Sequence, residues 1–369
     1  MYPLLRTALA PWLAISLIAS AAAADSDITT LIESGASQVA TGDQHSCALL
    51  QGGAVQCWGS NDYYQLGNSS TGTRTQPVAV RGLPPAKAIS AGGSHSCAIT
   101  TKGEVWCWGA NLQTQLDSSR KPHSAPVRIT ALGGAALQIS AGAAHSCAVI
   151  QGGALQCWGD NSNGQLGTGD QQEQTQAITV RGLPPIAHVA AADGHTCATT
   201  ASGGAYCWGF NLYGQVGDGS QTPRLAPTQV TGLAQGVKHL AAAPGHNCAL
   251  LANGAVQCWG YNYYGQLGEG TLQDRHQPTP VASLAAQAIA TGNEHSCAIS
   301  HTGAALCWGN NSSGQLGSPL MRGEGGSSAR RTPTPVTGLA CGQRQISAGR
   351  SHTCALSTAG AVQCWGKVD

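Results

Sequence analysis

Apolar and polar residues alternate along this chain in short segments. The segments "HSCALL" at 45–50 and "AVQCWG" at 54–59 follow a period of two, and Gly, Pro or Asn residues bound them. This pattern is typical of β-strands, and no convincing amphipathic helix interrupts it. The chain is therefore predicted to be all-β.

The segments recur as a repeat, which indicates the organisation of the chain. Each copy holds two cysteines separated by nine residues, the second cysteine precedes Trp-Gly, and successive copies lie 49 to 57 residues apart. Seven copies hold 14 of the 15 cysteines. The pairs are Cys47 with Cys57, Cys97 with Cys107, Cys147 with Cys157, Cys197 with Cys207, Cys248 with Cys258, Cys297 with Cys307 and Cys354 with Cys364.

Four strands are predicted in each copy. A strand that ends in small residues, such as Ala40–Gly42, precedes the two segments quoted above, and a fourth strand, such as "PVAV" at 77–80, follows a long polar loop. Four-stranded units repeated around an axis form β-propellers, which hide most strand edges. We predict a seven-bladed β-propeller of four-stranded blades, with the small residues nearest the axis.

The two ends of the repeat region complement each other. The last copy stops at "CWGKVD" without a fourth strand, whereas "DITTL" at 27–31 precedes the first inner strand. We predict that the N-terminal strand completes the C-terminal blade and closes the ring, giving a single domain over residues 25–369.

The first 24 residues, "MYPLLRTALAPWLAISLIASAAAA", combine one basic residue, an apolar run and a small-residue end. These features are typical of a signal peptide cleaved near Ala24. No lipid-accepting cysteine, twin arginine or later membrane-spanning run accompanies it. The mature protein is predicted to be soluble and secreted or periplasmic.

Charge excludes one class of function. Charged residues make up 9% of the chain, and without Arg6 of the signal peptide 17 basic residues balance 17 acidic ones. A nucleic-acid binder would carry a basic footprint, so no nucleic-acid partner is expected. Hydrophobic residues make up 42% of the chain, which is enough for a folded core.

The cysteine pairs fit a disulfide better than a metal site. If Gln51–Gly53 form a hairpin loop, Leu50 faces Ala54 and Cys47 faces Cys57, within the reach of a disulfide. An oxidising compartment favours that bond. A zinc site that includes His45 and free thiols are the alternatives, although zinc usually draws on four ligands. We predict seven disulfides, no metal and no cofactor.

Three further features of the repeat have structural interpretations. Trp58 falls on the hairpin face opposite the cysteines, with Ala48 and Leu50, and is expected to pack against the neighbouring blade. Cys341 has no partner in the pattern, so it is either a partly buried thiol or a bridge to another chain. One histidine recurs in every copy, which favours a structural hydrogen bond over catalysis. These histidines are His45, His95, His145, His195, His246, His295 and His352.

The segments "GDQHSCALLQGGAVQCWGSNDYYQLG" and "AAHSCAVIQGGALQCWGDNSNGQLGTGD" resemble the repeats of the regulator of chromosome condensation family. The resemblance covers residues 26–369 and implies a seven-bladed propeller closed by mixed terminal strands. The best-known member is an exchange factor for a small GTPase, acting on chromatin. Other relatives are secreted bacterial propellers, and one of them inhibits β-lactamases with the loops of one face.

The long loops between third and fourth strands collect aromatic residues, which suit a protein-binding face. Carbohydrate stacking is the alternative, and the rings could simply cover blade edges. We predict an exported or cell-surface protein as partner, or a glycan, bound by a monomer. The candidate residues are Tyr63, Tyr64, Phe210, Tyr213, Tyr261, Tyr263 and Tyr264.

The short Gly-x-x-His loops at the axial mouth bring together a weaker candidate. Asp43, Glu294 and Arg350 come from copies one, six and seven, which are neighbours in a closed ring. They are interpreted as a solvated ion cluster, with a hydrolase or lyase site as the alternative. A long insertion at 318–336 is predicted to be a mobile loop on the same face. The chain is predicted to be a binding module and not an enzyme.

Overall fold

The computed structural model describes residues 28–319 and 328–367, and within them all regular structure is β. These residues form 27 strands and no helix, so none of them provides an apolar helix able to cross a membrane. The predicted signal peptide, residues 1–24, and residues 320–327 of the predicted mobile insertion lie outside the described residues.

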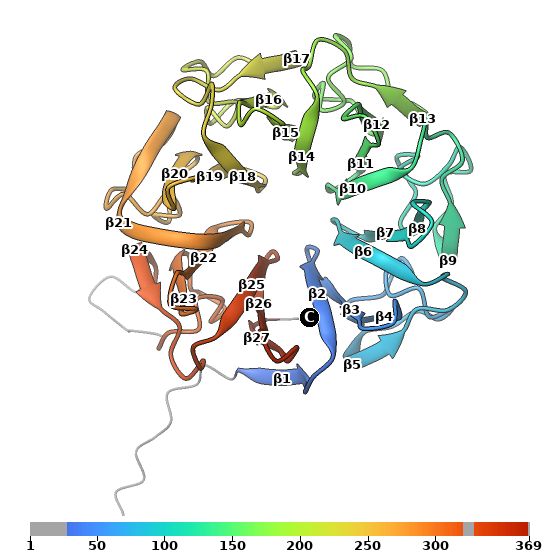
Figure 1. The fold of residues 1–369 in the computed structure, drawn as a ribbon, viewed down its shortest axis with the longest axis horizontal. Coiled ribbons are helices and arrows are strands. Elements are labelled where there is room, and N and C mark those ends of the chain that lie inside the picture. Colours follow the sequence, from blue (N-terminus) through green and yellow to red (C-terminus); the bar gives the residue numbers. More distant parts are fainter. Residues whose placement is uncertain (1–27, 320–327, 368–369) are drawn as a thin grey trace, which may run out of the picture.

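The strands form antiparallel sheets arranged around a central opening, and each sheet runs from the opening to the rim (Figure 1). The first strands lie nearest the opening. They are β2 (Ala36–Thr41), β6 (Ala86–Ala91), β10 (Ala136–Ala141), β14 (Ile186–Ala191), β18 (Val237–Ala242) and β25 (Gln343–Ala348). The second strands are β3 (His45–Leu50), β7 (His95–Thr100), β11 (His145–Ile150), β15 (His195–Thr200), β19 (His246–Leu251), β22 (His295–Ser300) and β26 (His352–Ser357).

The third and fourth strands follow in order toward the rim. The third strands are β4 (Val55–Gly59), β8 (Val105–Gly109), β12 (Leu155–Gly159), β16 (Ala205–Gly209), β20 (Ala255–Gly260), β23 (Ala305–Gly309) and β27 (Val362–Gly366). The fourth strands are β5 (Arg74–Ala79), β9 (His123–Arg128), β13 (Gln174–Thr179), β17 (Arg224–Gln229), β24 (Arg330–Pro335) and β1 (Thr29–Ile32).

Two sheets depart from the simple repeat. The N-terminal strand β1 pairs antiparallel with β27, with Thr29 opposite Cys364, so one sheet has the order β1-β27-β26-β25. The 17-residue strand β21 (Arg275–Thr291) pairs with β20 and then with β22, which joins two units into one seven-stranded sheet. Separate strands were expected here. The sequence "VASLAAQ" at 281–287 lacks the Gly-Leu-Pro-Pro that interrupts the chain in copies one and three.

The hairpin register confirms the predicted cysteine pairing. In each copy the two cysteines lie opposite each other across the second and third strands. All seven predicted pairs are disulfides, with Cα–Cα distances of 4.0 to 4.1 Å. Cys47 is bonded to Cys57, Cys97 to Cys107, Cys147 to Cys157, Cys197 to Cys207, Cys248 to Cys258, Cys297 to Cys307 and Cys354 to Cys364. Seven disulfides indicate an oxidising environment.

The remaining cysteine, Cys341, is unpaired, as the repeat pattern predicted. It lies in the loop before β25 and is exposed. The expectation of a partly buried thiol was therefore wrong, because this loop runs over the surface instead of packing into a blade.

Each tryptophan packs across the boundary between two copies. Trp108 of copy two lies in one core cluster with Cys47, Cys57 and Leu66 of copy one. Trp58 in turn packs with Ala48 against copy seven, as the face assignment predicted. In six copies the indole Nε1–H also donates a hydrogen bond to a backbone carbonyl of the preceding copy, at 2.8 to 2.9 Å.

The recurring histidines form hydrogen bonds between copies, which confirms a structural role. His45 Nε2 lies 2.8 Å from Ser96 Oγ, and Ser96 Oγ donates to the Gln65 carbonyl at 3.0 Å. Because the Ser96 proton is already donated, the histidine holds its proton on Nε2. The equivalent histidine contact joins each copy to the next, with Asn247 Oδ1 in place of the hydroxyl for His195 at 2.9 Å. His352 joins copy seven to copy one through Ser46 at 2.8 Å.

The boundary between copies seven and one differs from the others. Trp58 Nε1 is buried without a hydrogen-bond partner among the described residues. The core cluster around Trp58 also lacks a counterpart of Leu66. Gly366, which follows Trp365, is exposed, whereas the equivalent glycine is buried in the six other copies.

Chemical labelling checks the disulfides. Alkylation of the folded protein without reductant should modify one thiol, Cys341, because the other 14 cysteines are bonded in pairs. Reduction under denaturing conditions before alkylation should raise the count to 15. Mass spectrometry of the intact chain gives both counts. More than one label on the unreduced protein would contradict the pairing.

The unpaired Trp58 indole predicts that a Trp→Phe substitution lowers the free energy of unfolding less at Trp58 than at Trp158. Trp58→Phe and Trp158→Phe remove the same volume, but only Trp158 loses a hydrogen bond, to the Gln115 carbonyl at 2.8 Å. Trp158→Phe should therefore lower the free energy of unfolding by about 1 kcal/mol more than Trp58→Phe. Urea unfolding followed by circular dichroism measures the difference. Equal losses would show that the hydrogen bond adds nothing.

Acid should destabilise the fold through its histidines. Burial lowers the pKa of His45, His145, His246 and His295 to about 3 and of His95 and His195 to about 4. An unfolded histidine titrates near pH 6.5, so below that pH the unfolded chain binds more protons. Each histidine should therefore remove up to about 1.4 kcal/mol of stability per pH unit. Urea unfolding from about pH 7 to about pH 5 tests this expectation, and a flat profile would contradict it.

Candidate functional site

Buried amides shape the long loops that lead from third to fourth strands. In copy five, Asn262 Oδ1 accepts the Leu267 N–H at 3.0 Å, and Gln266 Oε1 accepts the Tyr264 N–H at 3.0 Å. Copy four has the same bonds, from Val216 to Asn211 and from Tyr213 to Gln215. The amide side chains therefore hold the backbone of the residues between them, which carry the aromatic rings.

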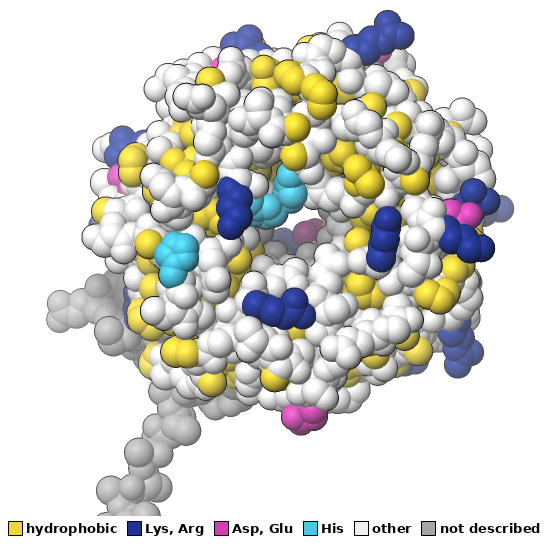
Figure 2. All heavy atoms as spheres, viewed as in Figure 1, with side chains coloured by type: hydrophobic (Ala, Val, Ile, Leu, Met, Phe, Trp, Pro, Cys, Tyr) yellow, Lys and Arg dark blue, Asp and Glu magenta, His cyan; other side chains and the backbone are white. Residues whose placement is uncertain are grey.

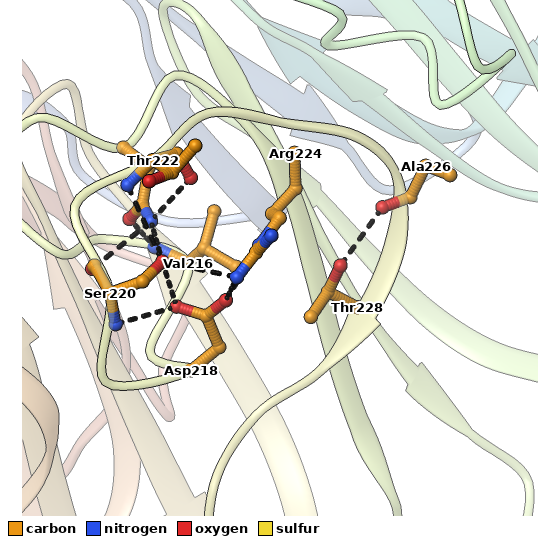
Figure 3. A network of polar contacts seen from close by, with 8 residues as sticks. Val216, Asp218, Ser220, Thr222, Arg224, Ala226 and Thr228 are labelled. Atoms are coloured by element: carbon orange, nitrogen blue, oxygen red, sulfur yellow. Dashed lines mark hydrogen bonds and ion pairs between the residues drawn. The ribbon is translucent and has the colours of Figure 1, made fainter.

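An ion pair fixes the outer half of the long loop in copies four and five. In copy four, Asp218 accepts Nε of Arg224 at 2.7 Å and the backbone N–H of Ser220 at 2.9 Å (Figure 3). Burial raises the pKa of Asp218, but these hydrogen bonds outweigh it and lower the pKa below its usual value. Glu269 and Arg275 form the equivalent pair in copy five, at 3.0 Å.

Five of the predicted aromatic residues form a continuous row across copies four and five. The ring of Tyr213 lies 4.8 Å from that of Tyr261, which joins the two copies. Phe210 extends the row at one end, with its ring 6.2 Å from Tyr213. Tyr263 and Tyr264 extend it at the other, with a 4.9 Å edge contact between them. Tyr213 and Tyr263 are 39% and 64% exposed, so two rings of the row face solvent.

The other two predicted aromatics, Tyr63 and Tyr64, lie apart from this row. They belong to copy one, and among the described residues no ring contact joins them to copies four and five. Tyr63 is 41% exposed. Tyr64 has a φ of 65°, because it occupies the left-handed loop position that Gly214 holds in copy four and Gly265 holds in copy five.

A pocket of about 380 Å³ lies beside the aromatic row. Phe210, Tyr213 and Tyr261 line it together with three carboxylates, and four copies contribute residues. The carboxylates belong to Asp160, Asp193 and Glu294. Glycines in the short loops of copies four and five leave space beside the aromatic rings. A Cβ atom at Gly194 would lie 3.2 Å from Phe210 Cβ, and one at Gly245 would lie 3.0 Å from Tyr261 Cβ.

The axial-mouth candidates divide between two sites. Asp43 and Arg350 line an adjoining opening of about 310 Å³ on the axis, which shares Asp193 with the aromatic pocket. The Arg350 N–H donates to the Asp43 carbonyl there at 3.1 Å. Glu294 lines the aromatic pocket instead and accepts Asn310 Nδ2 at 2.7 Å. Among the described residues, no ion pair joins Asp43 to Arg350.

The end of the axial opening that carries the Gly-x-x-His loops is acidic, because Asp43 and Asp193 lie there. Burial raises the pKa of Asp43, Asp193 adds to the rise, and Arg350 opposes it. Surrounding residues partly desolvate Asp193 and raise its pKa, with Asp160 contributing, although the residue stays exposed. The other end is basic, because Lys87, Lys238 and Arg344 follow the first residue of β6, β18 and β25. Figure 2 shows Lys, Arg and His side chains around the opening on the face that it presents.

Sequence reasoning missed Asp160 and Asp193. Asp193 stands in the short loop "ADGH" at 192–195, and Asp160 directly follows Trp-Gly in copy three. The residues at both positions differ between copies, so a comparison of the copies is the sequence signal that points to them. Their closeness to Glu294 depends on how four copies meet around the axis, which one copy alone does not show.

The fold and these loops define a propeller of tandem repeats with a variable loop face. The family model for the RCC1-like domain matches residues 27–342, and that for the regulator of chromosome condensation (RCC1) repeat matches residues 343–367. The chain therefore belongs to the RCC1-like domain family.

Similar proteins share parts of the chain or its fold. The ultraviolet-B receptor UVR8 of Arabidopsis thaliana is 33% identical over 144 residues, and the match spans 39% of this chain and 32% of the receptor. Human WBSCR16 is 20% identical with a TM-score of 0.75, covering 94% of this chain and 88% of that one. Prp20p of Saccharomyces cerevisiae is 21% identical with a TM-score of 0.73, covering 90% and 82%. At these identities the two structures support the fold alone.

Proposed function

We propose that this chain is an exported protein-binding module whose partner contacts the aromatic loops of copies four and five. The observation that carries the proposal is the row of five rings from Phe210 to Tyr264, with Tyr213 and Tyr263 exposed. The proposed partner is an exported or cell-surface protein. The proposal includes no catalytic step.

The rigidity of the loops favours binding. Buried Asn and Gln side chains and the pairs Asp218–Arg224 and Glu269–Arg275 hold the loop backbone before a partner arrives. A preorganised surface loses little conformational entropy on association. Tyrosine adds large contact area at low entropic cost, and such residues dominate many protein interfaces.

We further propose that the module is a closed ring of seven blades. Counting β21 as the fourth strand of one blade and the first of the next gives seven four-stranded units. The pairing of β1 with β27 supports closure by the N-terminal strand. The bonds from His352 to Ser46 and from the Arg350 N–H to the Asp43 carbonyl also connect copy seven with copy one.

Export rests on two observations of different kinds. The seven disulfides need an oxidising compartment, and the first 24 residues have the composition of a signal peptide. Prp20p binds Gsp1p and histones, but a neutral, disulfide-bonded chain favours a partner outside the nucleus. An exchange-factor role is therefore not proposed.

A carbohydrate ligand is the second candidate. The rings of Tyr261 and Tyr263 lie almost parallel, with an interplanar angle of 9° and centroids 6.3 Å apart. Flat rings of this kind can stack on sugars. Protein is preferred because the row continues through edge-on contacts of Tyr213 with Phe210 and of Tyr264 with Tyr263, which form an uneven surface.

Affinity capture with two matched variants tests the proposal. Mature protein, a Tyr213→Ala/Tyr263→Ala variant and a Tyr63→Ala/Tyr64→Ala variant are exposed to exported proteins and surface glycans of the source cells. The first variant should lose at least about tenfold in affinity for a captured protein, since exposed aromatic anchors dominate binding. The second should bind as the parent does. Equal capture by all three, or capture of glycans alone, would refute the assignment.

A further inference from the structure

The pocket beside the aromatic row combines features that select one kind of ligand. Its walls are the rings of Phe210, Tyr213 and Tyr261, and its charged groups are all carboxylates. No lysine, arginine or histidine is among the described residues that line it. An aromatic surface next to carboxylates attracts cations, because the π face and the carboxylate both carry negative potential.

We propose that this pocket receives a basic side chain, lysine or arginine, of the bound protein. The inference rests on the proposed function, because it assigns the chemistry of a partner at the same loops. The exposed part of the row would contact the surrounding partner surface, while the pocket would take one charged residue at its edge.

The carboxylates differ in how free they are to bind. Asp160 already accepts the Ser162 N–H at 3.0 Å and Gln165 Nε2 at 2.8 Å, so it fixes its own loop. Among the described residues, the Glu294 carboxylate accepts only the Asn310 side-chain amide, at 2.7 Å. Asp193 accepts no hydrogen bond from the described side chains, and it is exposed. Asp193 is therefore the principal group offered to a cation.

The local field has the sign that the proposal needs. Glu294 raises the pKa of Tyr264, and burial, with Tyr264 and Glu294, raises that of Tyr261. Tyrosine stays neutral where negative potential is strong, which keeps the rings available to a cation. A metal ion is a poorer occupant, since the described residues contain no group of three His, Cys, Asp or Glu side chains that could hold one.

The sequence distinguishes the copies that form this pocket from copies one and two. Copies four and five place Phe210 and Tyr261 directly after Trp-Gly, where copies one and two have Ser60 and Ala110. They also combine these rings with glycine in the facing short loop, at Gly194 and Gly245, which leaves space next to each ring.

The test measures binding of small cations directly. Protein labelled with 3-fluorotyrosine is titrated with Nα-acetyl-arginine amide, Nα-acetyl-lysine amide and the neutral isostere Nα-acetyl-citrulline amide, and ¹⁹F resonances are assigned with Tyr213→Phe and Tyr261→Phe. The Tyr213 and Tyr261 signals should shift with the arginine or lysine compound and reach a plateau, with a Kd of about 1 mM. Citrulline should leave them unmoved.

Matched variants separate a charge effect from a structural one. Asp193→Asn should weaken binding at least about fivefold, and Asp62→Asn, an exposed acid in the long loop of copy one, should not. Tyr261→Leu should weaken binding, whereas Tyr261→Phe keeps the ring and should restore most of it. Circular dichroism confirms that each variant is folded.

The outcomes distinguish this inference from the proposed function. No shift at about 10 mM cation, an equal shift with citrulline, a shift with N-acetylglucosamine alone, or no effect of Asp193→Asn would each overturn the basic-side-chain assignment. If the cations fail while Tyr213→Ala/Tyr263→Ala still abolishes protein capture, the protein-binding function stands without this pocket. If the cations bind while that variant captures normally, the pocket chemistry stands and the aromatic interface fails.

Discussion

Adjacent copies in this propeller depend on one shared acceptor, the backbone carbonyl of the glutamine in the Asn-x-x-x-Gln-Leu-Gly loop. The Gln165 carbonyl accepts both the Trp208 indole N–H and the Thr196 hydroxyl of the next copy, and His145 then bonds to that hydroxyl. Acceptor and donors belong to different copies, so no copy satisfies its buried polar groups alone. Apolar packing of tryptophan on the neighbouring disulfide acts in the same place.

The same loop contains buried residues that hold the fold together and exposed residues that differ between copies. Its Asn and Gln are buried and bonded, whereas the two residues that follow the Asn are exposed or half-buried. The exposed positions are therefore free to vary, because they contribute neither the carbonyl nor the buried leucine. In copies four and five they carry aromatic rings, and in copy three the position after Trp-Gly is Asp160. These exposed positions can thus change without loss of the contacts between copies.

Much of the fold could be predicted from the sequence, because each strand and each disulfide follows from contacts within one copy. The opposition of Cys47 and Cys57 needed only the hairpin loop, and the Trp58 face needed only the period of two. The uninterrupted β21 was missed, since it depends on pairing with two sheets. The candidate site was half predicted. The aromatic residues were found, but Asp193 became visible only when four copies were arranged around an axis.

The disulfides have a consequence for biosynthesis. Each joins residues ten apart on adjacent strands, and none links one copy to another. In the first six copies, the native partner of the first cysteine is therefore the next cysteine in the chain. An oxidant that simply joins the first two available thiols would produce these six pairs. In copy seven it would meet Cys341 before Cys354, so the last native pair forms only if Cys341 is left out of the reaction. Duplication or loss of one copy would leave this chemistry unchanged, so the number of repeats can evolve without new demands on the oxidative machinery.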